Sequence, residues 1–501
     1  MSAKQALRRF AVVCCAFAAL ALAPSSRSLA GPLDLPDIGS SADALLTTGG
    51  EIRLGKAFMR SVRAALPVSN DPLLNDYLET LGNELLSSDR DAGGRFSFFL
   101  IDEPVVNAFA GPGGYIGIYA GLILAAQSED ELAAVMSHEI AHVTQRHLTR
   151  GIEDQSKLTL PTTALMVAAA ILGSQVSGDV AAAAMAGVQA AALQRQINFT
   201  RDNEKEADRI GIATLAASGR DPYAMAGFFD RLSKTSRVSE SDVPELLRTH
   251  PVNTNRIADA LGRADEYGAR QRPDSLRFHL SRARLRELSY NRPEKALEAF
   301  RASLREGRYR DETAERYGLA WALLRSGKLE EAKAESGHLL QAHPSQPELI
   351  ALDAQIDLKR GRGAEALSHL RQAVELSPGS WALRSVYGRA LLEAGDPRLA
   401  LDQLKSVARA RPGDPGTFEL LEQAAIKSGN KGAAFRYRAE KLYAEGDLEP
   451  AIRQLEFALR QRDLPYHDTA QIQVLLDTMK EEEREQKKRG NDPMGLTVQG
   501  R

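Results

Sequence analysis

The sequence has little cysteine, few aromatic residues and no excess of charge of either sign. Of its 501 residues, 2 are cysteine and 6% are aromatic, and the formal net charge is −2 at pH 7. A net charge this close to zero provides no positive potential that would attract nucleic-acid phosphates, which argues against nucleic-acid binding. With 43% hydrophobic and 26% charged residues, the chain is also not disordered, collagen-like or a multi-span membrane protein.

The start of the chain also lacks an apolar run that could span a bilayer. The run at residues 10–23 is 14 residues long, whereas a membrane-spanning helix needs about 20. Basic residues precede this run and small residues follow it, so we predict a signal peptide over residues 1–30, cleaved near Ala30. Because Cys14 and Cys15 lie inside the run, the mature chain has no cysteine and forms no disulfide.

Residues 49–270 are predicted to form a domain of helices and one small sheet, after a linker at residues 31–48. Asp71 and Pro72 have the chemistry of a helix start, a capping residue followed by proline. Three segments have strand composition: residues 96–101, 105–110 and 115–119. Turn residues at 111–114 join the last two, which indicates a small antiparallel sheet.

The motif HEIAH at residues 138–142 is the most informative feature of the sequence. On a helix, His138 and His142 share one face and can reach the same metal, while Glu139 lies beside them and can polarise a bound water. This pattern predicts zinc-dependent peptide hydrolysis with Glu139 as the general base. The alternative is a solvated helix face, and His147, which falls off that face, is predicted to be ordinary surface.

A second acidic element follows the motif after a gap. Glu204 and Asp208 are four residues apart and share a face of a predicted helix. Glu204 would complete a site of two histidines and one glutamate that leaves the fourth zinc position to water, and Asp208 can orient a ligand. Glu206 is a competing acid, but it points to another face of the helix. The alternative is a salt-bridged surface helix.

The C-terminal half carries a repeat with a period of 34 residues. Three kinds of marker share this period: Gly327, Gly361 and Gly395; Ala332, Ala366 and Ala400; Pro344, Pro378 and Pro412. The pattern is typical of tetratricopeptide (TPR) helix pairs, so residues 275–480 are predicted to be an α-solenoid of four to six repeats with a protein-binding concave face. Residues 481–501 are predicted to be a charged tail, a helix end followed by disorder from Gly490.

These motifs together resemble the HtpX and CAAX-prenyl-endopeptidase superfamily of zinc metallopeptidases. Three segments are similar to its exported, TPR-bearing branch: NAFAGPGGY at residues 107–115, HEIAHV at 138–143 and THP at 249–251. The resemblance covers nearly all of the mature chain. It implies an α+β, mostly α fold, with a gluzincin-type metallopeptidase domain followed by the TPR solenoid.

The resemblance also implies a role for each residue of the site. His138, His142 and Glu204 would bind one Zn²⁺ per chain, with Glu139 as the catalytic base and Asp208 in support. His250 would approach the zinc as a removable fourth ligand and hold the enzyme latent. From the sequence alone, His250 is only a histidine before a proline.

Two segments have alternative interpretations. The strand at residues 105–110 is either an exposed edge that binds an extended substrate by strand addition or a hairpin in the core. Residues 158–193 are largely apolar but interrupted, so we do not expect a transmembrane span. That segment is a lid over the cleft, a peripheral contact with a membrane, or a buried helical hairpin.

We therefore expect an exported zinc endopeptidase of the periplasm whose TPR arm recruits substrates or assembly partners. By resemblance, it would degrade misfolded or stalled outer-membrane proteins during outer-membrane assembly. The expected partners are these proteins and the assembly machinery, with no nucleic acid. The alternative function is a chaperone or assembly scaffold in which the TPR surface acts and proteolysis is rare.

Overall fold

The computed structural model describes residues 48–89, 93–148, 201–238, 244–461 and 464–490. The predicted signal peptide, most of the predicted linker, and the segment at 158–193 lie outside these residues. Within the described residues, no helix is both long and apolar enough to cross a membrane.

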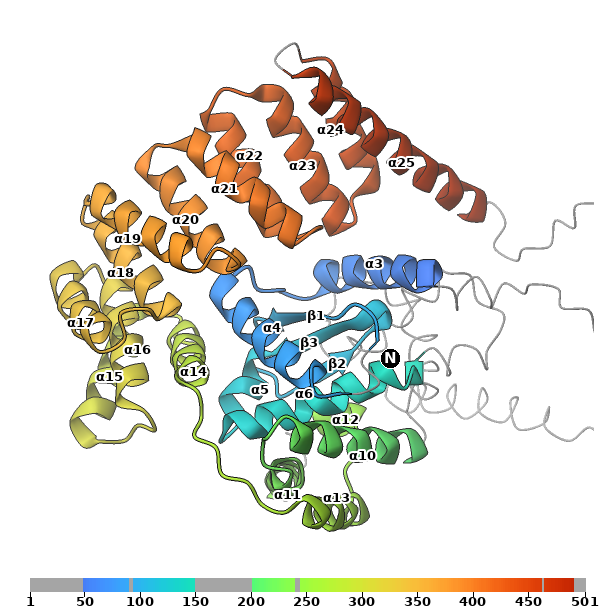
Figure 1. The fold of residues 1–501 in the computed structure, drawn as a ribbon, viewed down its shortest axis with the longest axis vertical. Helices are drawn as coiled ribbons and strands as arrows, with labels where there is room; N and C mark the ends of the chain where they lie inside the picture. The colour runs from blue at the N-terminus through green and yellow to red at the C-terminus, as the bar shows by residue number, and fades with distance from the viewer. Residues whose placement is uncertain (1–47, 90–92, 149–200, 239–243, 462–463, 491–501) are drawn as a thin grey trace, which may run out of the picture. The chain divides into compact units, whose positions relative to one another are not determined.

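The first part of the fold is a small sheet with two helices (Figure 1). Its elements are α3 (Thr48–Ala65), α4 (Pro72–Leu86), β1 (Ser97–Ile101), β2 (Ala108–Ala110) and β3 (Tyr115–Tyr119). The Asp71 side chain caps α4 by accepting hydrogen bonds from the backbone N–H groups of Leu73 and Leu74, as its sequence predicts. The strands follow the order β1-β3-β2.

The prediction of an antiparallel sheet is wrong for one of its two strand pairs. β2 pairs antiparallel with β3, but β1 pairs parallel with β3. The reason is the connection at residues 102–107, which crosses the sheet instead of turning tightly. β2 therefore lies one strand away from β1, and the turn at Gly111 brings β3 back between them. The second strand along the chain, β2, is also shorter than predicted, since it begins at Ala108.

The described residues of the N-terminal part contain six further helices: α5 (Ala120–Ala125), α6 (Glu129–Thr144), α10 (Arg201–Ala217), α11 (Tyr223–Val238), α12 (Glu245–Thr249) and α13 (Thr254–Tyr267). α6 begins at Ser128, whose hydroxyl accepts from the backbone N–H of Glu131. α6 contacts α4, α10, α11 and β2, and almost all of its residues are buried. A helix enclosed in this way holds its side chains in fixed positions.

The C-terminal part is a run of antiparallel helix pairs from α14 to α25 (Figure 1). Its helices are α14 (Leu276–Leu288), α15 (Pro293–Glu306), α16 (Glu312–Arg325), α17 (Leu329–Ala342), α18 (Pro347–Lys359), α19 (Gly363–Leu376), α20 (Trp381–Ala394), α21 (Pro397–Ala410), α22 (Pro415–Lys427), α23 (Lys431–Glu445), α24 (Leu448–Leu459) and α25 (Tyr466–Gly490). The charged residues 481–489 are the end of α25, as expected.

The repeat markers have clear structural roles. Gly327, Gly361 and Gly395 have φ values of 72°, 76° and 90°, and each ends the first helix of a pair in the left-handed conformation that favours glycine. Ala332 and its repeat equivalents are fully buried, because a small side chain lets paired helices approach. Gly446 falls out of register since it ends α23, the second helix of its pair.

Candidate metal centre

Helix α6 presents the HEIAH motif inside the protein. The side chains of His138, Glu139 and His142 are 2%, 1% and 2% exposed, which excludes the solvated helix face. The Nε2 atoms of the two histidines lie 3.0 Å apart, as expected for residues one helical turn apart that face the same point.

Helix α10 brings its acids to this pair. The carboxylate oxygens of Glu204 lie 3.6 Å from the Nε2 atoms of both His138 and His142. Asp208, one turn further along α10, approaches His138 from the opposite side, with its Oδ1 atom 2.9 Å from Nδ1. Both acids are 3% exposed, so α10 is not a salt-bridged surface helix at this point.

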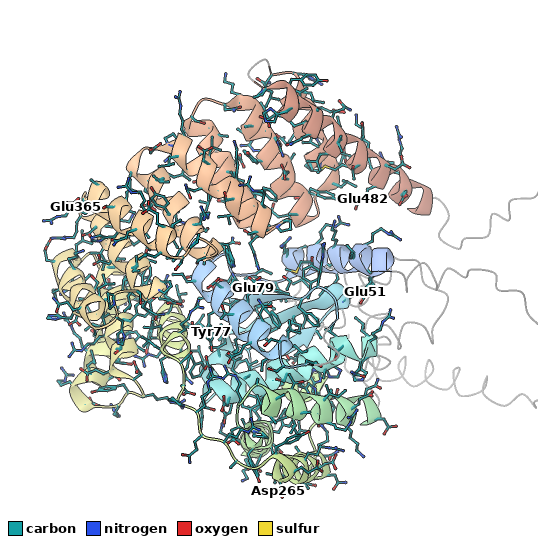
Figure 2. All side chains as sticks on the ribbon, in the orientation of Figure 1. Glu51, Tyr77, Glu79, Asp265, Glu365 and Glu482 are labelled. Atoms are coloured by element: carbon teal, nitrogen blue, oxygen red, sulfur yellow. The ribbon has the colours of Figure 1, made fainter. Side chains whose placement is uncertain are left out.

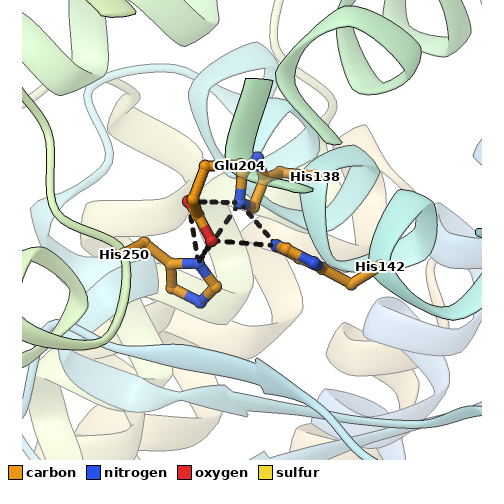
Figure 3. Close-up of side chains that lie close together, drawn as sticks. All are labelled: His138, His142, Glu204 and His250. Atoms are coloured by element: carbon orange, nitrogen blue, oxygen red, sulfur yellow. Dashed lines mark hydrogen bonds and ion pairs between the residues drawn. The ribbon is translucent and has the colours of Figure 1, made fainter. Parts of the chain in front are cut away.

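His250 completes the group from a distant part of the chain. It caps the C-terminus of the short helix α12, and its Nδ1 atom lies 3.3 Å from His138 Nε2 and 3.1 Å from Glu204 Oε1. Its other ring nitrogen, Nε2, lies 3.4 Å from Glu139 Oε1. His250 therefore contacts both the other metal-ligand candidates, with which it is drawn in Figure 3, and the predicted base.

The donor set fits a zinc ion. One ligand atom from each of His138, His142, Glu204 and His250 lies within 4.8 Å of the others. Ligand atoms bound tetrahedrally about 2.1 Å from zinc lie about 3.4 Å apart, close to the 3.0 to 3.6 Å separations between neighbouring donors here. Neutral imidazole nitrogens and a carboxylate oxygen are also ligands that zinc prefers. The four side chains can enclose a single divalent cation.

Burial shapes the electrostatics of Glu139. Desolvation raises the pKa of its carboxyl, and the nearby His250 and His138 partly oppose this shift. Among the described residues its oxygens have only weak donors: Nε2 of His250 lies 3.4 Å from Oε1, and a hydrogen bond from the Ala110 backbone lowers the pKa by less than the two histidines do. A buried carboxylate with a raised pKa and acceptor positions of this kind is suited to take a proton from a water molecule.

Arg256 on α13 holds the two acids of α10 in place. Its guanidinium donates to both oxygens of Asp208 at 2.8 Å and lies 2.8 Å from Glu204 Oε2. Burial would raise the pKa of Asp208, but His138 and Arg256 lower it overall. The sequence did not predict a role for Arg256, since a single arginine in an amphipathic helix has no distinguishing signal.

The prediction that His147 is ordinary surface is wrong. Its side chain is 1% exposed, and its Nδ1 atom lies 2.7 Å from Nδ1 of His142. The prediction assumed that the helix continues to residue 147. Instead α6 ends at Thr144 and the chain turns at Arg146, where φ is 54°. This turn directs His147 back toward the motif.

A second group of possible ligands lies in the repeats and has a different character. Asp353, Asp357 and His369 lie close together. The Lys333 ammonium already lies between the two carboxylates, 2.8 Å from Asp353 and 2.6 Å from Asp357. The single ammonium offsets part of the charge of the two acids, and Arg360 lies 3.2 Å from Asp357 as well. The Lys333 pairs join α17 to α18, so the cluster is a structural contact between repeats.

Comparison with known proteins identifies the family. The profile of peptidase family M48 matches residues 72–264, and a tetratricopeptide repeat profile matches residues 357–418. The Beta-barrel assembly-enhancing protease of Escherichia coli (strain K12) is 34% identical over 447 residues, covering 89% of this chain and 91% of that protein. The chain belongs to this family of M48 peptidases.

A second relative is consistent with this family. The Putative beta-barrel assembly-enhancing protease of Vibrio cholerae is 36% identical over 422 residues, which cover 84% of this M48 peptidase and 87% of that protein. Among solved structures, the match to the TPR protein YrrB covers 36% of this chain and 92% of the YrrB chain, with 22% sequence identity and a TM-score of 0.27.

The family confirms the predicted enzyme class. This M48 peptidase is a zinc metalloendopeptidase with TPR repeats, and the findings fit that function and not the scaffold alternative. The α+β, mostly α fold is confirmed as well. The boundaries of the two domains and the roles of individual site residues stay predictions.

Proposed function

We propose that this M48 peptidase is a latent zinc endopeptidase of the Gram-negative periplasm that acts during outer-membrane assembly. His138, His142 and Glu204 would hold the zinc, and Glu139 would act as the base. The observation that carries this proposal is the buried donor set itself, which has two histidines and a glutamate within reach of one cation and a second buried carboxylate beside them.

Zinc, when bound at such a site, lowers the pKa of a water molecule to about 7 and polarises a peptide carbonyl. Glu139 accepts a proton from the water and later gives a proton to the leaving amine. Burial raises its pKa, which strengthens the carboxylate as a base, and the charge of a bound cation would oppose this shift.

His250 would act as a latch. With Nδ1 directed at the metal-ligand candidates and Nε2 near Glu139, it fills the position that a substrate carbonyl and water need. The segment that carries it is anchored by the backbone N–H of Leu246, which donates to the carbonyl of Val106 at 3.1 Å. A substrate that displaces this short segment would open the site.

Strand β2 would bind the substrate backbone. The main-chain groups of Asn107 and Gly111 bond to β3, so the alternation of an antiparallel ladder turns those of Ala108 and Ala110 toward the other edge of β2. That edge is covered in this structure: Ala108 is buried, its N–H donates to Oδ1 of Asn107, and the carbonyl of Val106 accepts from Leu246. A substrate would have to replace these contacts. Because β2 also contacts α6, an extended peptide added along this edge would pass the metal centre. Binding through the main chain gives little sequence selectivity, which suits the degradation of many unfolded proteins.

The biological role rests on the relatives. The Escherichia coli and Vibrio cholerae proteins are named for enhancing the assembly of β-barrels, which supports substrates among misfolded or stalled outer-membrane proteins. The TPR helices, which form protein-binding surfaces in solenoids of this kind, would recruit these substrates or the assembly machinery. A location in the periplasm agrees with the predicted signal peptide.

The test is zinc content and casein cleavage of the purified chain and of Glu139→Gln. We expect one zinc per chain in both, with cleavage lowered about 10²- to 10⁴-fold in the variant because it lacks the general base. Glu298→Gln, on the exposed face of α15, is the matched control and should cleave like wild type. A wild-type chain without zinc, or an active Glu139→Gln, would contradict the proposal.

A further inference from the structure

The two histidines of α6 have different partners at Nδ1, the ring nitrogen that faces away from the other metal-ligand candidates. His138 has Asp208 directly at its Nδ1 atom, 2.9 Å away. His142 instead has a second histidine at its Nδ1 atom, since Nδ1 of His147 lies 2.7 Å away. The opposite nitrogen of His147, Nε2, lies 3.0 Å from Oε2 of Glu206.

The direction of these hydrogen bonds follows from the metal-facing atom. Nε2 of His142 is the nitrogen near His138 and Glu204, so its lone pair is the one available to a metal. Nδ1 of a neutral His142 then carries the proton and donates it. Nδ1 of His147 must accept that bond, which leaves the His147 proton on Nε2, where Glu206 accepts it.

We propose that His147 and Glu206 form a positioning relay that fixes the ring orientation and tautomer of His142 for metal binding. The inference rests on the proposed metal site and adds two residues to it. Helix α10 would then supply three acids with separate tasks. Glu204 binds the metal, Asp208 supports His138 directly, and Glu206 supports His142 through His147.

The backbone beside the relay supports this assignment. Among the described residues, Arg146 is the one non-glycine residue with a positive φ, 54°. A left-handed conformation is unfavourable for a residue with a side chain, and strain of this kind persists where the surrounding structure requires it. Here it turns the chain just after α6 and places His147 against His142.

The simpler interpretation is that His147 only fills space at the end of α6. The two interpretations differ in what a ring without nitrogen would do. His147→Phe keeps an aromatic ring but leaves the N–H of His142 without its acceptor. His147→Asn keeps an acceptor near the position of Nδ1 and should therefore bind zinc nearly as well as the wild type. A space-filling residue would show the opposite order, because phenylalanine keeps a planar ring in place, whereas asparagine leaves part of that space empty.

The experiment measures zinc affinity by chelator competition, and the visible spectrum of the cobalt(II)-substituted protein, on the full chain. We expect His147→Phe to weaken zinc binding about 10- to 100-fold and to change the cobalt bands. His147→Asn should stay within about threefold of wild type. His467→Phe, at an exposed histidine, is the control and should change neither property.

A second pair of variants covers the case in which His147→Phe does not fold. Glu206 has a side chain that is 31% exposed, so Glu206→Ala is expected to fold. It should weaken zinc binding several-fold relative to Lys205→Ala, its exposed neighbour on α10. Equal affinities for this pair, or a His147→Phe protein with wild-type affinity and cobalt spectrum, would overturn the relay. A wild-type chain that binds no zinc would instead refute the metal site.

Discussion

The Oδ1 atom of Asp208 lies 2.9 Å from Nδ1 of His138, and the same oxygen lies 2.8 Å from Nη2 of Arg256. One buried carboxylate therefore joins helices α6, α10 and α13. A histidine whose Nδ1 donates to a carboxylate is fixed in orientation and binds metal more strongly through Nε2. Asp208 thus connects the position of α10 to the geometry of the metal centre.

Replacing Asp208 with asparagine should weaken the metal site. The neutral amide would lack the charge that supports His138 and the second oxygen that pairs with Arg256, so we expect Asp208→Asn to lower zinc affinity about 10- to 100-fold. Chelator competition measures this loss. Asp202→Asn, at an exposed position of the same helix, is the control. An unchanged affinity would show that Asp208 has no part in holding His138.

Removing the proposed latch should activate the enzyme. In His250→Ala the other three ligand candidates remain, so zinc content should not change. If the latch is closed in about nine of ten molecules, casein cleavage should rise about tenfold. The control is His279→Ala, at a histidine that lies near Asp274 and is not part of the metal-ligand group. It should leave cleavage unchanged. Cleavage by His250→Ala at or below the wild-type rate, with zinc still bound, would refute the latch.

Arg220 should be critical for the stability of the peptidase domain. Its side chain is 1% exposed and pairs with Asp130 at 2.9 Å and with Glu129 at 3.3 Å. The hydroxyl of Tyr77, labelled in Figure 2, also donates to Glu129 at 3.0 Å. Arg220→Met would leave buried carboxylates without their cation at the start of α6.

Loss of a buried partner of this kind costs about 3–5 kcal/mol of unfolding free energy, which urea denaturation followed by circular dichroism can measure. Arg263→Met removes an exposed pair with Asp259, one turn away on α13, and should cost about 0.3–0.5 kcal/mol. Similar losses for the two variants would mean that burial adds nothing to the Arg220 network.

The turn between β2 and β3 should not accept a side chain at Gly114. Its φ is 77°, and a Cβ atom there would lie 1.9 Å from the carbonyl oxygen of Arg95. Gly413 has a similar φ of 81°, but a Cβ atom at that position would meet no described atom within 4 Å. Gly413→Ala should therefore lower the free energy of unfolding only by the cost of a left-handed backbone at alanine, about 1–2 kcal/mol.

Gly114→Ala should cost clearly more than Gly413→Ala in the same denaturation experiment, because the Arg95 backbone must also move. It should lower casein cleavage too, since β2 borders the metal centre. Equal costs for the two substitutions would show that the turn adapts without strain.

Local features of the chain were predictable from the sequence. The helix that carries HEIAH and the start of α4 at Asp71 follow from spacing and capping, which depend on neighbours along the chain. The TPR pairs follow from a period of 34 residues, because glycine and alanine meet the same backbone and packing demands in every repeat.

Features that depend on distant segments were not predictable in the same way. The parallel pairing of β1 with β3 depends on the path of the connection at residues 102–107, and strand composition does not specify that path. Arg256 and His147 carry no signal in the sequence, since their importance comes from the carboxylates and the histidine that they meet in space.

The sequence by itself determined which chemical groups this protein carries: two histidines and a glutamate on one helix, an acid on another, and a repeated helix pair. The tertiary structure alone decided which groups meet. His250 is 112 residues from His138 along the chain, yet their ring nitrogens lie 3.3 Å apart. Such proximity is set by how helices pack around a shared core, and packing depends on all the contacts of the fold together.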